Sequence, residues 1–142
     1  MSYHQELEIV GGEAIVGHAV RSRRDLVDAV RGGLPIGTIE HVVASGRLSL
    51  AEVDAVVLPR KTLSHRKTIG TLTPDQSDRL MRAAGIIATA EEIFGSKEKA
   101  GRWLRRPTTA LDGEAPIALL DTAQGTLIVR DLLARIDHGL AA

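Results

Sequence analysis

An apolar stripe at helical spacing in residues 73–95 is the feature that most constrains the fold. Thr73 is placed as an N-cap, Pro74 as the first helical residue and Gly95 as the stop. One face between them is apolar: Leu80, Ala83, Ala84, Ile87, Ala90 and Phe94. The opposite face carries the i, i+4 pairs Asp75–Arg79 and Asp78–Arg82. The pattern predicts one long amphipathic helix with a buried side.

Weaker helical patterns precede this helix. Residues 18–30 read as a helix that Ser22 or Arg23 begins and Gly32-Gly33 ends. Residues 34–46 read as the next, with Pro35 at its first position and Gly46 at its end. Residues 49–67 read as two short helices joined by a tight turn at residues 57–59, the first opened by a Ser49–Glu52 capping box.

Helical patterns also follow it. We expect Ser96 to cap a helix that runs through Trp103 and Leu104 and ends before Pro107. Residues 108–115 read as a loop and residues 116–120 as a brief helical turn. Thr122 caps the last helix, which ends at Gly139 and whose predicted apolar stripe is Ile128, Val129, Leu132, Leu133 and Ile136.

No strand-like alternation occurs after residue 18, so we predict an all-α fold, a short helical bundle. Residues 1–17 are expected to be a flexible segment with short extended pieces, because three glycines interrupt any helical stripe. We expect residues 18–70 to form a helix-turn-helix-like part for dimerisation or DNA binding and residues 71–142 to form a helical C-terminal part. The alternative is that the two parts share one core. Ile36, Ile39, Val42 and Val43 are either a dimer face or internal core.

The amino-acid composition and the distribution of charge exclude some classes of function. Aromatic residues make up 2% of the chain, so the core must be aliphatic. Eighteen basic and eighteen acidic side chains balance, which excludes a generally basic nucleic-acid binder. The basic side chains nevertheless gather: residues 59–82 hold six against two acidic, and residues 97–106 hold five against one. Residues 107–142 are acidic, with two basic against five acidic side chains.

The sequence also lacks the marks of membrane proteins and enzymes. It has no long apolar run and no signal-like N-terminus, so we expect a cytoplasmic protein without membrane contact. Cysteine is absent and the five histidines are dispersed, so we expect no metal site. No phosphate-binding glycine motif occurs, and we expect no cofactor. The pairs Asp112/Glu114 and Asp121/Asp137 are better explained by solvation and capping than by acid–base catalysis. We therefore predict that the chain is not an enzyme.

The second helix of residues 49–67 is a candidate for DNA contact. Its polar side chains suit phosphates and base edges: Arg60, Lys61, Thr62, Ser64, His65, Arg66 and Lys67. The alternative is a basic, solvated helix with Leu63 in the core. One copy would bind DNA weakly and in a salt-dependent way, so a dimer would be expected.

Several motifs of the chain occur together in a known family. They are Leu58-Pro59-Arg60-Lys61-Thr62-Leu63 with Arg66-Lys67, the run from Leu72 to Leu80, Ala90-Glu91-Glu92-Ile93-Phe94-Gly95, Lys99-Ala100-Gly101-Arg102-Trp103-Leu104, the run from Pro116 to Thr122, and Ile136-Asp137-His138-Gly139. In this order and spacing, over about residues 34–142, the chain resembles the Xre/MbcA/ParS-type antitoxins and looks most similar to the ParS branch.

The resemblance implies an antitoxin of a type II toxin–antitoxin system. Its partner would be a RES-domain toxin that consumes NAD⁺, by ADP-ribosyl transfer or by degrading the dinucleotide. The resemblance further implies a homodimer within a larger complex. Its helix-turn-helix part dimerises and in many members binds the operon's own promoter DNA. Its C-terminal part, here residues 71–142, binds the toxin and blocks the NAD⁺ site.

Two groups of residues are our candidates for toxin contact. Trp103, Arg105 and Arg106 combine side chains that are common interface anchors, although Trp103 also fits the core of a three-helix packing. The acidic C-terminal helix then ends in Asp137, His138, Gly139 and Leu140, which we expect at the mouth of the toxin's electropositive pocket. The alternative there is an exposed, frayed helix end. The competing function is a stand-alone helix-turn-helix transcriptional repressor.

Overall fold

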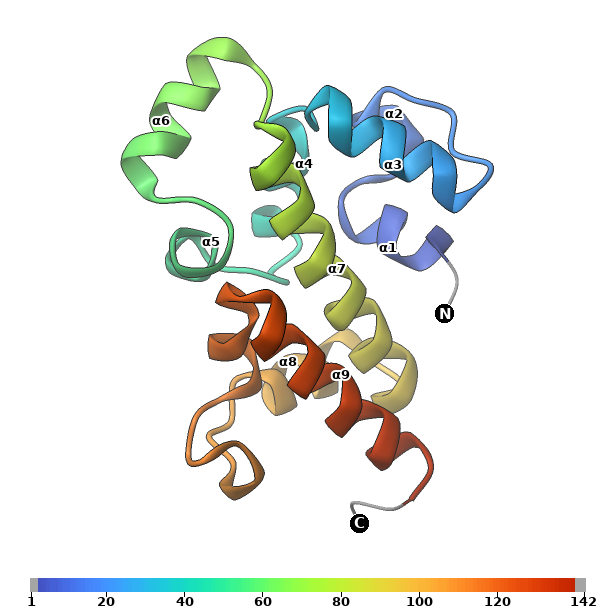
Figure 1. The fold of residues 1–142 in the computed structure, drawn as a ribbon, viewed down its shortest axis with the longest axis vertical. Helices are drawn as coiled ribbons and strands as arrows, with labels where there is room; N and C mark the ends of the chain where they lie inside the picture. Colours follow the sequence, from blue (N-terminus) through green and yellow to red (C-terminus); the bar gives the residue numbers. More distant parts are fainter. Residues whose placement is uncertain (1–2, 140–142) are drawn as a thin grey trace.

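The computed structural model describes residues 3–139, and these residues form an all-α fold, which confirms the predicted fold class (Figure 1). The helices in chain order are α1 (Tyr3–Ile9), α2 (Gly12–Val16), α3 (Arg23–Gly32), α4 (Gly37–Ala44), α5 (Leu50–Val56), α6 (Arg60–Ile69), α7 (Pro74–Phe94), α8 (Lys97–Leu104), the 3₁₀ helices η1 (Thr109–Leu111) and η2 (Pro116–Asp121), and α9 (Ala123–Asp137). No helix within this described range is long and apolar enough to cross a bilayer.

The long helix α7 is the centre of the molecule. The apolar stripe predicted one buried side, whereas residues 83–88 are all buried, so the middle of the helix is covered on every side. Thr73 accepts a hydrogen bond from the Gln76 N–H and so caps it, and Pro74 is its first residue. Leu80, Ile86 and Ile87 are fully buried. Helices α1, α3, α8 and α9 all pack against α7, which runs diagonally through Figure 1. Both halves of the chain therefore share one helix and one core.

The predicted helix-turn-helix is present. Ser49 and Glu52 form the predicted capping box at the start of α5. The turn between α5 and α6 buries Val57 and Leu58 and places Pro59 before the first residue of α6. Ile39 and Val42 of α4 are buried and Ile36 and Val43 pack against the same core, so these four side chains serve the core of one chain.

Pro35 does not begin a helix as predicted, because it takes part in a short tertiary bridge. Pro35 pairs with Thr71 in an isolated antiparallel β-bridge, and the Ile36 N–H donates to the Gly70 carbonyl at 2.9 Å. The Leu34 N–H donates to Ser77 Oγ of α7 at 2.8 Å. This bridge ties the segment before α4, which begins at Gly37, to the start of α7.

The expectation of extended pieces in residues 1–17 is wrong. Residues Tyr3–Ile9 and Gly12–Val16 are helical, and Leu7, Ile9 and Val10 are buried. Gly11 and Gly17 adopt positive φ angles of 109° and 80° and flank α2. These two glycines therefore mark the ends of a helix instead of preventing one from forming. The burial of α1 against α7 supplies the stability that its local sequence lacks.

The C-terminal helices follow the predicted caps. Ser96 and Thr122 accept hydrogen bonds from backbone N–H groups at the starts of α8 and α9. The predicted apolar stripe of α9 is correct at Val129, Leu132 and Leu133, which are buried, and wrong at Ile128, which is 49% exposed. The reason is that α9 approaches η2 through Gly125, where any side chain would collide with the Leu119 carbonyl. That close approach sets the rotation of α9 and leaves Ile128 outside.

Candidate functional site

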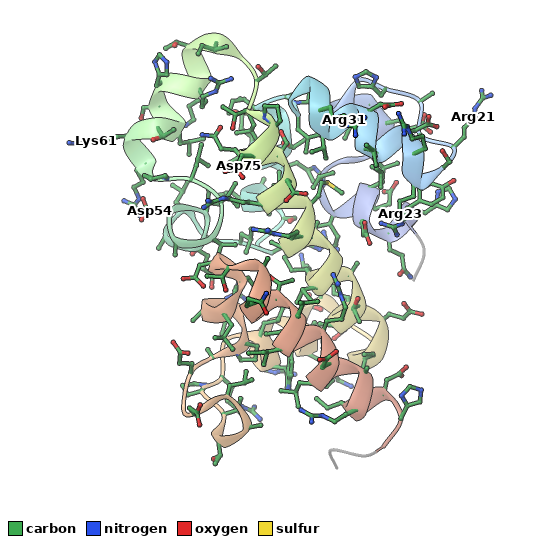
Figure 2. All side chains as sticks on the ribbon, viewed as in Figure 1. Arg21, Arg23, Arg31, Asp54, Lys61 and Asp75 are labelled. Atoms are coloured by element: carbon green, nitrogen blue, oxygen red, sulfur yellow. The ribbon has the colours of Figure 1, made fainter. Side chains whose placement is uncertain are left out.

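Helix α6 presents its polar side chains on an outer edge of the molecule. Its one buried residue is Leu63, and Arg60, Lys61, Ser64, His65 and Lys67 are exposed. Figure 2 shows Lys61 pointing away from the rest of the fold. The helix thus buries one side chain and exposes three basic side chains, Arg60, Lys61 and Lys67, which suits a helix that enters a groove of DNA.

Two of the residues predicted to contact DNA are half-buried and contribute to the folded structure. Arg66 is half-buried, and its Nε donates a hydrogen bond to the Thr71 carbonyl at 2.7 Å. Thr62 is half-buried beside Leu63. Arg66 therefore connects α6 to the segment that precedes α7, and a change there would alter the position of α6 as well as its charge.

Trp103 lies against the core. Its ring packs on Phe94 at the end of α7, with the ring centroids 5.3 Å apart and tilted by 36°. The side chain is half-buried and joins the same apolar cluster as α7. Core packing was the predicted alternative to toxin contact for Trp103. It leaves only part of the indole ring available to a partner.

Arg105 is held in an ion pair with Glu52 of α5. Its Nε lies 2.8 Å from Glu52 Oε2 and its Nη2 lies 2.8 Å from Glu52 Oε1, while Nη2 also donates to the Arg47 carbonyl at 3.1 Å. Burial raises the pKa of Glu52, but the hydrogen bonds from Arg105 and Ser49 and the charge of Arg105 outweigh it, so the pKa is lowered overall. Arg105 therefore joins α8 to the helix-turn-helix, and Arg106 beside it is exposed.

A second ion pair secures the same region. Arg47, in the turn between α4 and α5, donates from Nε to Glu91 Oε2 of α7 at 2.7 Å and from Nη2 to Glu91 Oε1 at 3.0 Å. Sequence reasoning missed both pairs. The two residues of the Arg47–Glu91 pair lie 44 residues apart in the sequence and those of the Glu52–Arg105 pair lie 53 apart, so no local sequence pattern predicts either pair.

The end of α9 is exposed. Asp137, His138 and Gly139 are all exposed, and the His138 ring is hydrogen-bonded through Nδ1 to the Ala134 carbonyl at 2.8 Å. Leu140, the fourth candidate there, lies outside the described residues. Figure 1 shows the end of α9 at one extremity of the molecule, whereas Arg105 is joined to α5. The toxin-contact candidates thus lie in two separate places.

The expectation of an acidic C-terminal helix is wrong for α9 itself. Its charged residues Arg130, Asp131, Arg135 and Asp137 balance. The excess negative charge of this region belongs to Asp112, Glu114 and Asp121, which are exposed in the segment between α8 and α9. Within residues 3–139, no three His, Asp or Glu side chains are grouped to hold a metal ion.

Two family profiles match the chain. Residues 25–85 match the antitoxin Xre-like helix-turn-helix domain, a range that covers most of α3, all of α4 to α6 and the first half of α7. Residues 89–139 match the antitoxin Xre/MbcA/ParS C-terminal toxin-binding domain, which covers α8 and α9. The two matched ranges meet inside α7, the helix that both parts share.

Curated relatives agree with the profiles. The chain is 33% identical over 118 residues to "Antitoxin Xre" of Yersinia enterocolitica, covering 81% of this chain and 80% of the relative. It is 42% identical over 95 residues to "Antitoxin Xre" of Pseudomonas putida, covering 66% of this chain and 59% of the relative. It is 26% identical over 129 residues to "Prs ADP-ribosylating antitoxin" of a Sphingobium species, covering 83% and 81%.

These matches confirm the family predicted from the sequence motifs and, with it, a protein that is not an enzyme. The chain belongs to the Xre/MbcA/ParS antitoxin family, as a type II antitoxin with an Xre-like helix-turn-helix domain and a C-terminal domain that binds its cognate toxin.

Proposed function

We propose that this antitoxin neutralises a RES-domain toxin that consumes NAD⁺ and that the end of α9 blocks the toxin's NAD⁺ site. The observation that carries the proposal is the exposed end of α9 within a toxin-binding domain. The similarity to a relative named as an ADP-ribosylating antitoxin supports the class of toxin. An ADP-ribosylating toxin takes its ADP-ribose from NAD⁺, so covering that site would stop the reaction.

The chemistry of the α9 end fits such a role. A pocket for NAD⁺ must hold two phosphates and therefore offers cationic or N–H groups to anions. The Asp137 carboxylate is exposed at the tip and would occupy such a position. Gly139 has a φ of 74°, a conformation that glycine adopts without strain, and it turns the chain where α9 ends. Because the charges of α9 balance, Asp137 would act as a single local anion.

Truncation after Ile136 tests this proposal. We expect the RES-domain toxin to be encoded by a neighbouring gene. The shortened chain should co-purify with this toxin but leave NAD⁺ consumption active, since α8 and most of α9 remain. The substitution Asp137→Asn should weaken inhibition in the same assay. Asp131→Asn is the matched control, because Asp131 is an exposed carboxylate of the same helix away from its tip. Full inhibition by the truncated chain would contradict the blocking role.

We further propose that the antitoxin binds its own operator as a homodimer through α6. The exposed Arg60 and Lys61 at the start of α6 support this, because recognition helices contact DNA near their N-terminus. A stand-alone repressor would share this helix but would have no use for a toxin-binding domain. DNA binding is therefore assigned here to repression of the antitoxin's own operon, and gel-shift titration with the promoter duplex tests it.

A further inference from the structure

We propose that the groove between the α4–α5 turn and α8 is a docking site for an acidic segment of the toxin, separate from the end of α9. This inference rests on the proposed function, because it assigns a second contact surface to the same complex. The groove has a volume of about 710 Å³. Ser45 and Gly46 form one side, and α8 forms the other.

The groove is strongly cationic. Lys97, Arg102, Arg105 and Arg106 line it, and Glu98 is the one carboxylate among its described lining residues. This is the second basic block of the sequence, gathered by α8 onto one wall. A surface with this excess of positive charge favours a partner that brings carboxylates.

Internal bonds hold the walls of the groove in place. Lys97 Nζ donates to the Ser45 carbonyl at 2.8 Å, and Arg105 bridges to Glu52 and to the Arg47 carbonyl. Gly101 has no side chain, and a Cβ there would lie 2.9 Å from Arg105 Nη1, so the glycine lets Arg105 lie along α8. A preformed groove loses little conformational entropy when a partner enters it.

Arg102 and Arg106 are the side chains that remain available. Both are exposed, and neither guanidinium forms an ion pair with the described residues of this chain. Arg102 lies in the last turn of α8 and Arg106 lies two residues beyond the end of that helix, and both line the groove. Planar guanidinium groups bind carboxylates in a bidentate manner, which makes this pair suited to Asp or Glu side chains of a partner.

The surroundings favour a protein over DNA as the occupant. The α8 wall lies within the range matched by the toxin-binding domain. Between this groove and α6 stands α5, which carries Glu52 toward Arg105 and Asp54 toward the Arg60 N–H. Arg105 compensates the charge of Glu52, so Asp54 is the carboxylate at this point that would repel a phosphate backbone continuing from α6 into the groove.

Charge reversal tests the proposal. We expect Arg102→Glu/Arg106→Glu to weaken binding of the purified RES-domain toxin about tenfold or more, since like charges would then face each other. The loss should be greatest at low salt, because screening weakens contacts between exposed charges. The matched control is Arg21→Glu/Arg31→Glu, the same change in net charge at exposed residues of the α3 region (Figure 2).

The measurement separates this inference from the proposed function. If the unaltered chain neither binds nor inhibits the toxin, both fail. If it inhibits the toxin and the Arg102→Glu/Arg106→Glu variant binds the toxin as tightly as the control variant, the groove is not a docking site and the proposed function stands. Loss of promoter binding with toxin binding unchanged would assign the groove to DNA and overturn the inference. Thermal unfolding of each variant checks that the fold is intact.

Discussion

Glu52 shows how one side chain connects two parts of the molecule. Its Oε1 accepts a hydrogen bond from the Ser49 N–H at 2.8 Å and so closes the capping box of α5. Both of its oxygens also accept from Arg105 of α8. The first contact is three residues away and was predicted from the sequence. The second spans 53 residues and became visible only in the fold.

The substitution Glu52→Gln should separate these two contacts. Glutamine keeps the oxygen that caps α5 but loses the charge, so we expect a loss of about 1 kcal/mol in the free energy of unfolding at neutral pH. The folded-state pKa of Glu52 lies below its ordinary value of 4.5. Its contribution is therefore complete above pH 4.5 and disappears as the pH falls through the lowered value. Urea unfolding at neutral pH and at a pH below the lowered pKa of Glu52 measures how the Glu52→Gln substitution changes the free energy of unfolding.

The control variant makes the same change of charge at a carboxylate outside the Glu52–Arg105 ion pair. Glu92→Gln alters an exposed carboxylate of α7 and should change the stability by less than about 0.5 kcal/mol at either pH. A stability difference for Glu52→Gln that stays the same in acid would contradict the assigned ion pair.

Helix α6 is held to the rest of the molecule by few buried side chains. Leu63 is its single buried residue, and Arg66 connects it to Thr71. Its sequence correctly predicted a basic helix, but burial divides the seven DNA-contact candidates into an exposed set and the half-buried pair Thr62 and Arg66. The distinction could not be made from residue type, because Arg60 and Arg66 are chemically identical.

This division predicts different results for two arginines of α6. Arg60→Ala and Lys61→Ala should each reduce the salt dependence of operator binding by roughly 0.9 in the logarithmic slope if each contacts one phosphate. Neither should alter stability by more than about 0.5 kcal/mol, because both side chains are exposed. Arg66→Ala should lower stability by about 1–2 kcal/mol, since it leaves the Thr71 carbonyl without this donor.

Fluorescence anisotropy against salt concentration and thermal unfolding provide the two readouts. Arg24→Ala is the control, because Arg24 is an exposed arginine on α3 whose ion-pair partner among residues 3–139 is the neighbouring Asp28. A salt slope unchanged in both the Arg60→Ala and the Lys61→Ala variants would remove α6 from the DNA interface.

The whole molecule is organised around α7. The sequence placed a boundary near residue 70, whereas the family profiles meet between residues 85 and 89. Helices α1 and α3, which precede both boundaries, and α8 and α9, which follow them, all pack against α7. Neither division leaves both parts with a complete core, because α7 supplies buried residues to each.

We therefore expect a single cooperative unfolding transition for the full chain, reported equally by Trp103 fluorescence and by helical circular dichroism. A fragment of residues 1–70 lacks α7 and should be largely unfolded, since α1 and α3 lose the surface they cover. A fragment of residues 1–94 keeps α7 and is the matched control, expected to retain more helix. Two separate transitions, or a stably folded 1–70 fragment, would contradict the shared core.

The sequence alone determined which segments are helical wherever the decisive contacts are local. Each of five residues caps a helix by accepting from an N–H three residues later: Ser22, Ser49, Thr73, Ser96 and Thr122. The last four were predicted as helix starts, and Ser22 was one of two alternatives for its helix. The ordered motifs also sufficed for the family. These features depend on residues that are neighbours in the chain, so no knowledge of the fold is needed.

Only the tertiary structure decided how those helices are used. Burial of α1 against α7 and of α2 against α1 and α4 made helices of residues 3–9 and 12–16. The contact of Gly125 with η2 turned Ile128 outward, and Glu52 paired with an arginine first assigned to the toxin. Each outcome depends on groups far apart in sequence that meet only after folding. Local propensities differ by less than about 1 kcal/mol per residue, whereas burying an apolar side chain contributes about 1.5–3 kcal/mol, so packing prevails where the two disagree.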